Sequence, residues 1–158
     1  MEMMKYKASD IEEVVSLFYE TVHKVNSKDY SQVQLDVWAP LEEKNMKVSS
    51  WKDSLIQNIT YVVRMNEQII GFSDLTSSGH LERLFVHKDF QGKGVASALV
   101  DKLESEAVKL NILDIDTEAS ITAKSFFERR GYKIICSQTV EKNGVKLINY
   151  QMNKRLAY

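Results

Sequence analysis

Hydrophobic residues in the first forty positions recur with the period of a helix. Ile, Val and Phe stand three or four positions apart over residues 11–25, which predicts a helix with one apolar face. Capping-box patterns precede this helix at Ser9–Glu12 and a shorter second helix at Ser31–Gln34. After the chain's single proline, which helps to end the second helix, residues 41–50 are polar and are expected to form a loop. A helical turn is expected over 51–57.

The pattern changes after residue 58, where β-branched and aromatic residues dominate short runs separated by turn residues. Strands are expected over 59–65, 68–75, 80–86, 111–117, 132–140 and 145–152, with a weaker one over 3–7. A long amphipathic helix is expected from Gly92 to Leu110, and a short one over 122–130. The dipeptide Asn143-Gly144 between the last two strands is a strong hairpin signal.

The expected elements follow one another in the order β-α-α-β-β-β-α-β-α-β-β. Three consecutive strands before the long helix predict a meander, and the β-α-β unit after them predicts a parallel pair. We therefore expect an α/β (α+β mixed) fold, a twisted mixed sheet of about seven strands with helices on both faces. The 158 residues, 44% hydrophobic and 27% charged, fit a single domain over 1–158.

Composition argues against several classes of function. The one cysteine, Cys136, cannot form an intrachain disulfide, and one thiol with three histidines is no zinc-cluster ligand set, so no metal is expected. The 21 basic and 22 acidic residues give a net charge of −1, which argues against nucleic-acid binding. No apolar run approaches the roughly 20 residues of a membrane span, and the first residues lack a signal-peptide pattern. A cytoplasmic protein without membrane contact is expected.

The segment between the strand ending at Val86 and the long helix carries the most informative chemistry. Gly92 and Gly94 lack Cβ atoms, so their amides can approach a bulky anion. The first turn of a helix adds free N–H groups and a positive dipole end, and Lys88 and Lys93 add charge. Together these features predict a pyrophosphate site; turn geometry alone is the structural alternative. The pattern is neither a P-loop nor a dinucleotide fingerprint.

The spacing Gln91-x-x-Gly94-x-Ala96 resembles the Q/R-x-x-G-x-G/A motif of the GNAT superfamily of acyl-CoA-dependent N-acetyltransferases. The strand Leu84–Val86 sits where the family's central strand sits, and Ala123–Tyr132 looks like its A-x-x-F-Y-E-x-x-G-F helix ending. The order of elements agrees over nearly the whole chain. The sequence of residues 118–128 is similar to that of the small bacterial YafP-like branch of the family.

The resemblance implies transfer of an acetyl group from acetyl-CoA, as co-substrate, to a primary amine of a small molecule or peptide by direct attack in a ternary complex. It implies that two neighbouring parallel strands splay apart and that the pantetheine arm lies between them. A homodimer is also compatible with it. The residues implied at the cofactor are Leu84, Phe85, Val86, Gln91, Gly92, Lys93, Gly94, Val95, Ala96, Ser97, Ser120 and Phe127.

Two of these residues depart from the family pattern. Phe127 stands where many members carry a tyrosine that protonates the leaving thiolate, and Ser120 stands where many carry an asparagine. Tyr150 is a candidate proton donor in place of Phe127; alternatively the thiolate leaves unassisted, since a thiol pKa is only about 8.5. The departures keep open a second function, a non-catalytic acyl-CoA-binding or regulatory domain. An unrelated nucleotide-binding domain is a third.

The acceptor needs a base, because an alkyl amine with a pKa of about 10.4 is protonated at neutral pH. Glu82 is the best candidate, since it lies two positions before Leu84 and hence on the same face of the strand. A salt bridge or simple exposure is the structural alternative. His80, two residues earlier on the same face, could serve as the base instead or contact the acceptor; an exposed turn histidine is the structural alternative. Tyr30, Trp38 and Trp51 fall in a region that often walls the acceptor site in this superfamily, and they are expected to line that site or to belong to the core.

Overall fold

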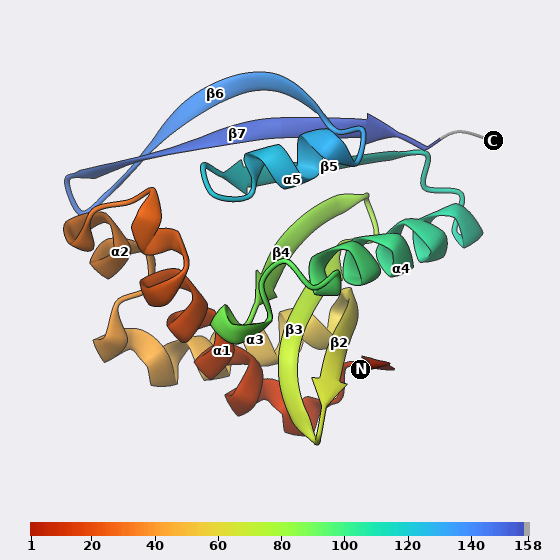
Figure 1. The fold of residues 1–158 in the computed structure, drawn as a ribbon, viewed down its shortest axis with the longest axis horizontal. Coiled ribbons are helices and arrows are strands. Elements are labelled where there is room, and N and C mark those ends of the chain that lie inside the picture. Colours follow the sequence, from red (N-terminus) through yellow and green to blue (C-terminus); the bar gives the residue numbers. More distant parts are fainter. Residues whose placement is uncertain (157–158) are drawn as a thin grey trace.

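The computed structural model describes residues 1–156 and contains a seven-stranded sheet (Figure 1). Its strands are β1 (Glu2–Lys5), β2 (Ile59–Met65), β3 (Gln68–Leu75), β4 (His80–Val86), β5 (Asp114–Ser120), β6 (Lys133–Lys142) and β7 (Val145–Arg155). Their order across the sheet is β1-β2-β3-β4-β5-β7-β6. Among the described residues, β4 and β5 form the one parallel pair. The predicted mixed sheet is therefore confirmed.

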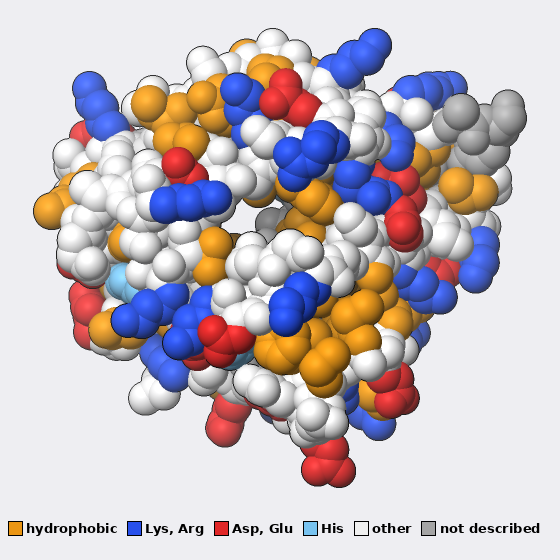
Figure 2. Space-filling view, viewed as in Figure 1, with side chains coloured by type: hydrophobic (Ala, Val, Ile, Leu, Met, Phe, Trp, Pro, Cys, Tyr) orange, Lys and Arg blue, Asp and Glu red, His pale blue; other side chains and the backbone are white. Residues whose placement is uncertain are grey.

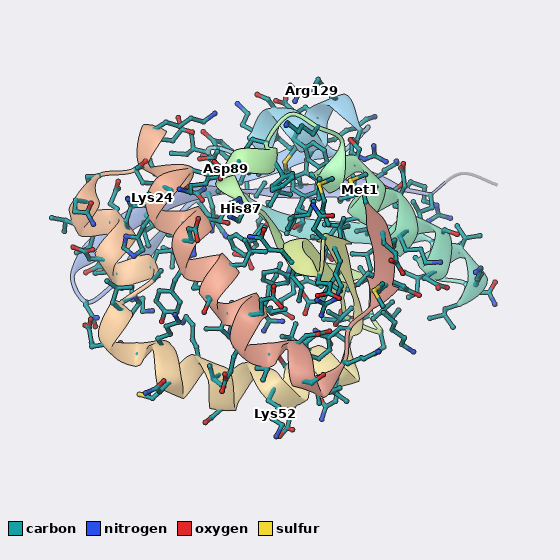
Figure 3. The ribbon with its side chains drawn as sticks, turned by 60° about the horizontal axis from the view of Figure 1, so that its bottom comes forward. Met1, Lys24, Lys52, His87, Asp89 and Arg129 are labelled. Atoms are coloured by element: carbon teal, nitrogen blue, oxygen red, sulfur yellow. The ribbon has the colours of Figure 1, made fainter. Side chains whose placement is uncertain are left out.

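Helices cover both faces of this sheet. They are α1 (Ile11–Lys24), α2 (Gln32–Trp38), α3 (Lys44–Gln57), α4 (Val95–Lys109) and α5 (Lys124–Arg129). Helices α1 and α3 pack together on one face of the β2–β4 region, and α4 packs on the opposite face (Figures 1 and 3). Helix α2 contacts β7, and α5 contacts β5 and β6. Within residues 1–156, no helix is long and apolar enough to cross a bilayer.

The expected loop over 41–50 is wrong, because these residues form a 3₁₀ turn and the first half of α3. Helix α3 turns Val48, Trp51 and Leu55 toward the core, and most of its other residues face solvent. The polar residues that favoured a loop are the outer side of this helix. Its conformation depends on packing against α1, since tertiary contact supplies most helical stability in proteins.

One of the two predicted helix caps is confirmed. The Gln34 N–H donates to the Ser31 hydroxyl at 3.2 Å, and the Ser31 N–H donates to the Gln34 side chain at 2.9 Å. The cap at Ser9–Glu12 is wrong. Asp10 instead accepts from the Lys7 N–H at 2.9 Å and pairs with Arg64 of β2 at 2.5 Å. Asp10 therefore closes the 3₁₀ turn Ala8–Asp10 that leads into α1, and the same carboxylate joins that turn to β2.

The sheet opens between β4 and β5. The two strands pair at only two positions, His80 with Asp116 and Leu81 with Thr117. The Thr117 hydroxyl also donates to the Leu81 carbonyl at 2.9 Å. Beyond these pairs β4 stays with β3 and β5 stays with β7, so the strands diverge. The parallel pair predicted from the sequence is present, and it diverges as the resemblance implied.

Gly79, in the turn before β4, sets the position of this junction. Its φ is +93°, and a Cβ atom there would lie 2.5 Å from the Asp114 carbonyl oxygen. Its own carbonyl accepts from the Asp116 N–H at 3.0 Å. We expect Gly79→Ala to lower the free energy of unfolding by about 1–3 kcal/mol, through backbone strain and a steric clash.

Gly144→Ala is the matched control for this variant. Gly144 also has a positive φ, +76°, but nothing lies within 4 Å of its Cβ position. Urea denaturation of both variants measures the difference, and Gly79→Ala should cost more. Equal losses would show that the close approach to Asp114 contributes nothing.

Candidate active site

A cavity of about 1410 Å³ occupies the opening between β4 and β5. Its walls come from these two strands, from the start of α4, from α5 and β7, and from α1, α2 and α3. Figure 2 shows a hollow at the middle of this face, with Lys and Arg side chains at its rim. The opening in the sheet therefore gathers chain segments that are far apart in sequence.

The free edge of β4 presents main-chain groups to this cavity. The His87 N–H donates to the Ile70 carbonyl of β3 at 2.8 Å. Because hydrogen-bonding alternates along an antiparallel pair, the main-chain groups of Phe85 also point toward β3, and those of Leu84 and Val86 point into the gap. The expectation for the main chain of Phe85 is thus corrected. Its ring still lines the cavity.

The loop after β4 is braced from two sides. The Val86 carbonyl accepts from the Gln91 side-chain amide at 2.6 Å and from the Thr21 hydroxyl of α1 at 3.3 Å. Gln91, expected at the phosphates, therefore holds the end of β4 against the turn that leads into α4.

The turn into α4 forms one end of the cavity, and main-chain N–H groups without intrahelical acceptors lie there. Helix α4 begins at Val95, three residues later than expected, and its first intrahelical bond runs from the Ala98 N–H to the Gly94 carbonyl at 3.0 Å. The N–H groups of its first three residues therefore lack intrahelical acceptors and line the cavity. Gly92 and Gly94 have φ of +70° and +84°, which glycine adopts readily. Lys93 does not line the cavity.

Glu82 lies at a β-bulge. Leu81 and Arg83 face neighbouring residues of β3, which leaves Glu82 as the extra residue of β4. The bulge interrupts the alternation of side chains between the two faces of β4. The spacing of two residues therefore does not place Glu82 on the same face as Leu84, contrary to the expectation from the sequence. The Glu82 side chain is nevertheless exposed and lines the cavity. It forms no ion pair and no hydrogen bond with residues 1–156.

Comparison with known proteins identifies the family of this chain. Residues 26–154 match the family model described as Acetyltransferase (GNAT) domain. The chain belongs to the GNAT family of N-acetyltransferases. The uncharacterized N-acetyltransferase YafP of Escherichia coli (strain K12) is 32% identical to it over 152 residues, which cover 96% of this chain and 94% of YafP. The expected family and enzyme class are confirmed.

Solved structures of GNAT proteins share this fold. A GCN5-related N-acetyltransferase from Rhodopseudomonas palustris has a TM-score of 0.89 at 28% identity, covering 98% of this chain and 95% of that one. The PaiA N-acetyltransferase from Thermoplasma acidophilum, in complex with coenzyme A, has a TM-score of 0.78 at 17% identity, covering 98% of each chain. At 17% identity, the similarity to the PaiA structure shows a shared fold only.

In this N-acetyltransferase, two of the residues expected at the acceptor or the leaving group lie outside the cavity wall. The His80 imidazole pairs with Asp116, at the closed end of the β4–β5 junction. The Tyr150 ring packs beneath the Lys124 ammonium group, 4.9 Å from its centroid. Its neighbour Asn149 lines the cavity instead, because successive strand residues point to opposite faces.

Tyr30 and Trp38 line the cavity and also hold it together. The Tyr30 hydroxyl donates to the Ile148 carbonyl of β7 at 2.7 Å and accepts from the Ile121 N–H at 2.9 Å. Burial raises the pKa of this hydroxyl, which keeps it protonated and able to donate. Trp38 packs edge-on against Tyr30 at 5.3 Å between ring centroids. Tyr30 and Trp38 therefore line the cavity and also pack in the hydrophobic core.

Ser120 and Phe127 both line the cavity near the start of α5. The Ser120 hydroxyl accepts from the Ala123 N–H at 3.1 Å and so closes the turn after β5. Phe127 is 2% exposed and packs edge-on against Tyr132. It brings no polar atom to the site. Within residues 1–156, no group of three His, Cys, Asp or Glu side chains could hold a metal ion.

The charged cavity residues Lys47 and Arg83 were not found from the sequence, whereas Trp51 was expected there or in the core and does line the cavity. Lys47 belongs to the part of α3 that was expected to be a loop. Its spacing of four residues from Trp51, one helical turn, was the available signal. Arg83 lines the cavity while forming an ion pair with Asp74, which is fully buried. Burial raises the pKa of Asp74, and the Arg83 charge and a 2.9 Å hydrogen bond from Asn58 oppose that shift.

The two hydrogen bonds of Tyr30 give a testable contribution to stability. We expect Tyr30→Phe to lower the free energy of unfolding by about 1–2 kcal/mol, because it removes two part-buried hydrogen bonds, to the Ile148 carbonyl and from the Ile121 N–H. Tyr6→Phe is the control, since the buried Tyr6 hydroxyl has no hydrogen-bond partner among the described residues. Urea denaturation compares them; a Tyr6→Phe loss as large as that of Tyr30→Phe would contradict the bridging role.

Proposed function

We propose that this enzyme transfers the acetyl group of acetyl-CoA to a primary amine of a small molecule or peptide by direct attack in a ternary complex. The observation that carries the proposal is the divergence of β4 and β5 after two paired positions, beside a cavity that ends at the N-terminus of α4. An open strand edge and a helix N-terminus in one cavity match the two parts of the co-substrate, a diamide arm and a pyrophosphate.

The main chain would hold most of the co-substrate. The free N–H groups at the start of α4 and the dipole of this 15-residue helix favour a pyrophosphate there. The Leu84 main-chain groups and the Val86 N–H, which face the gap, are suited to pair with the amides of the pantetheine arm, whereas the Val86 carbonyl already accepts from Gln91 and Thr21. One of these N–H groups is suited to polarise the thioester carbonyl. A protein with this fold, PaiA of Thermoplasma acidophilum, forms a complex with coenzyme A, which supports binding of this co-substrate.

Glu82 is proposed as the general base. It removes a proton from the ammonium form of the acceptor, directly or through one water, and the neutral nitrogen attacks the carbonyl carbon of the thioester. The C–N bond forms, the C–S bond breaks, coenzyme A leaves as a thiolate, and the acylated nitrogen releases its second proton to solvent to give the neutral amide. The lack of an ion pair at Glu82 within residues 1–156 leaves its carboxylate free for this proton.

No side-chain acid is assigned to the leaving group. Phe127 has no proton to donate, and the Tyr150 ring lies outside the cavity wall. A thiol with a pKa of about 8.5 leaves readily as its thiolate near neutral pH. Protonation from solvent after release therefore completes the reaction.

Calorimetric titration tests the proposed co-substrate. We expect tight binding of acetyl-CoA and coenzyme A, and none of ATP or NAD at the same concentrations, because the site combines phosphate contacts with an edge for the pantetheine amides. Thiol release from acetyl-CoA with mixed amines then tests turnover. Selective binding without thiol release would favour a non-catalytic acyl-CoA-binding domain.

Glu82→Gln tests the base. We expect kcat to fall by roughly 10²–10⁴ and the acid limb of the pH–rate profile to flatten, since the amide cannot accept the proton. Glu67→Gln, in the exposed β2–β3 turn, is the control for loss of a carboxylate, and Tyr150→Phe is the control for the leaving group. An unchanged pH–rate profile in Glu82→Gln would remove the assignment; a large loss in Tyr150→Phe would restore Tyr150 as the acid.

A further inference from the structure

On the α3 side of the sheet, away from α4, two basic side chains meet on one aromatic ring of the cavity. The Arg83 guanidinium lies 4.4 Å from the centroid of the Trp51 ring, and the Lys47 ammonium lies 5.8 Å from it. Lys47 is also 5.6 Å from the centroid of the Phe18 ring. Phe18, Lys47, Trp51 and Arg83 all line the cavity. This Lys47 cluster therefore borders the part of the cavity that lies away from the α4 end proposed for the co-substrate.

Only one of these two cations has an acidic partner. Arg83 is neutralised by the buried Asp74 and also donates to the Ser54 hydroxyl at 3.1 Å. The Lys47 ammonium forms no ion pair or hydrogen bond with the residues that the structure describes. Glu43, one helical turn earlier, favours the charged form of Lys47 but forms no ion pair with it.

The environment of Lys47 leaves its charge under-compensated. Partial burial and then the charge of Lys142 lower the pKa of the Lys47 ammonium, with Arg83 acting in the same direction and Glu43 opposing. Lys142 lines the same cavity. An anion beside Lys47 would replace the lost hydration and offset these like charges.

Glu82 lines the same cavity as the Lys47 cluster, and it directly precedes Arg83 of that cluster on β4. Three carboxylates line the cavity, but those of Asp29 and Glu118 already accept hydrogen bonds, from Thr122 and Gln138. Lys28, Lys47 and Lys142 all line the cavity without an ion pair among the described residues, and of these three only Lys47 lies over aromatic rings. The free Glu82 carboxylate and the Lys47 ammonium group together suit a ligand with one charge of each sign.

We propose that the acceptor is an amine that also carries a carboxylate, as an amino acid does, and that Lys47 binds this carboxylate. The inference rests on the acetyl transfer proposed above and specifies its acceptor. The amine faces Glu82, the carboxylate faces Lys47, and the rings of Phe18 and Trp51 contact the hydrocarbon between them. A charge-assisted hydrogen bond to the ammonium group gives the selectivity.

Steady-state kinetics with matched acceptor pairs tests this proposal. Each pair is an aliphatic or aromatic amino acid and the amine that lacks its carboxylate, for example phenylalanine and phenethylamine. We expect kcat/KM to favour the amino acid by roughly ten-fold or more, and Lys47→Met to abolish that preference. Methionine keeps the unbranched apolar stem of lysine, so packing on Phe18 and Trp51 is retained.

Lys52→Met is the matched control. Lys52 belongs to the same helix but is exposed on its outer side (Figure 3). The preference for the amino acid should survive in this variant. A wild-type preference for the amines without carboxylate across the panel, or a preference that persists in Lys47→Met, would overturn the proposal.

A binding measurement separates this inference from the transferase proposal. Quenching of tryptophan fluorescence by 3-phenylpropanoate, with the protein saturated in coenzyme A, reports the anion site without turnover. Binding that weakens roughly ten-fold or more in Lys47→Met, but not in Lys52→Met, supports the anion site even if no amine is acetylated. Acetylation of both members of each pair with equal efficiency would support the transferase and refute the anion site.

Discussion

The structure depends on a seam in its sheet, where β4 and β5 share only two paired positions. Beyond them the facing main-chain groups of both strands have no strand partner, and buried main-chain groups need hydrogen bonds. The seam is therefore an edge that can accept a ligand with a peptide-like arm. The cavity, the placement of the α4 N-terminus and the α3 cluster all follow from the point at which the two strands part.

The two parts of the sheet are held in place at several points around this seam. Helix α4 connects β4 to β5 and packs on β2, β3 and β4. The Thr117 hydroxyl closes the paired end, and the Tyr30 hydroxyl ties the region before α2 to β7 and to the turn after β5. These contacts lie at the ends of the opening, which explains how the gap persists in a packed molecule.

The two sides of the seam use different chemistry. The α4 side consists largely of main-chain N–H groups, which many sequences can present provided that glycines allow the positive φ of Gly92 and Gly94. The α3 side consists of side chains, with Lys47 and Trp51 on one helix and Glu82 on β4. A common fold can therefore keep one co-substrate while side chains on the opposite side select the acceptor.

Local sequence determined the strands, the Asn143-Gly144 hairpin with both residues at positive φ, the Ser31–Gln34 cap and the glycine turn before α4. Each depends on residues that are neighbours in the chain. Tertiary structure alone decided that Asp10 pairs with Arg64 of β2, that Glu82 is the bulged residue, and that Lys47 and Arg83 both lie over the Trp51 ring. These features join residues distant in sequence, and periodicity carries no information about which distant residues will meet.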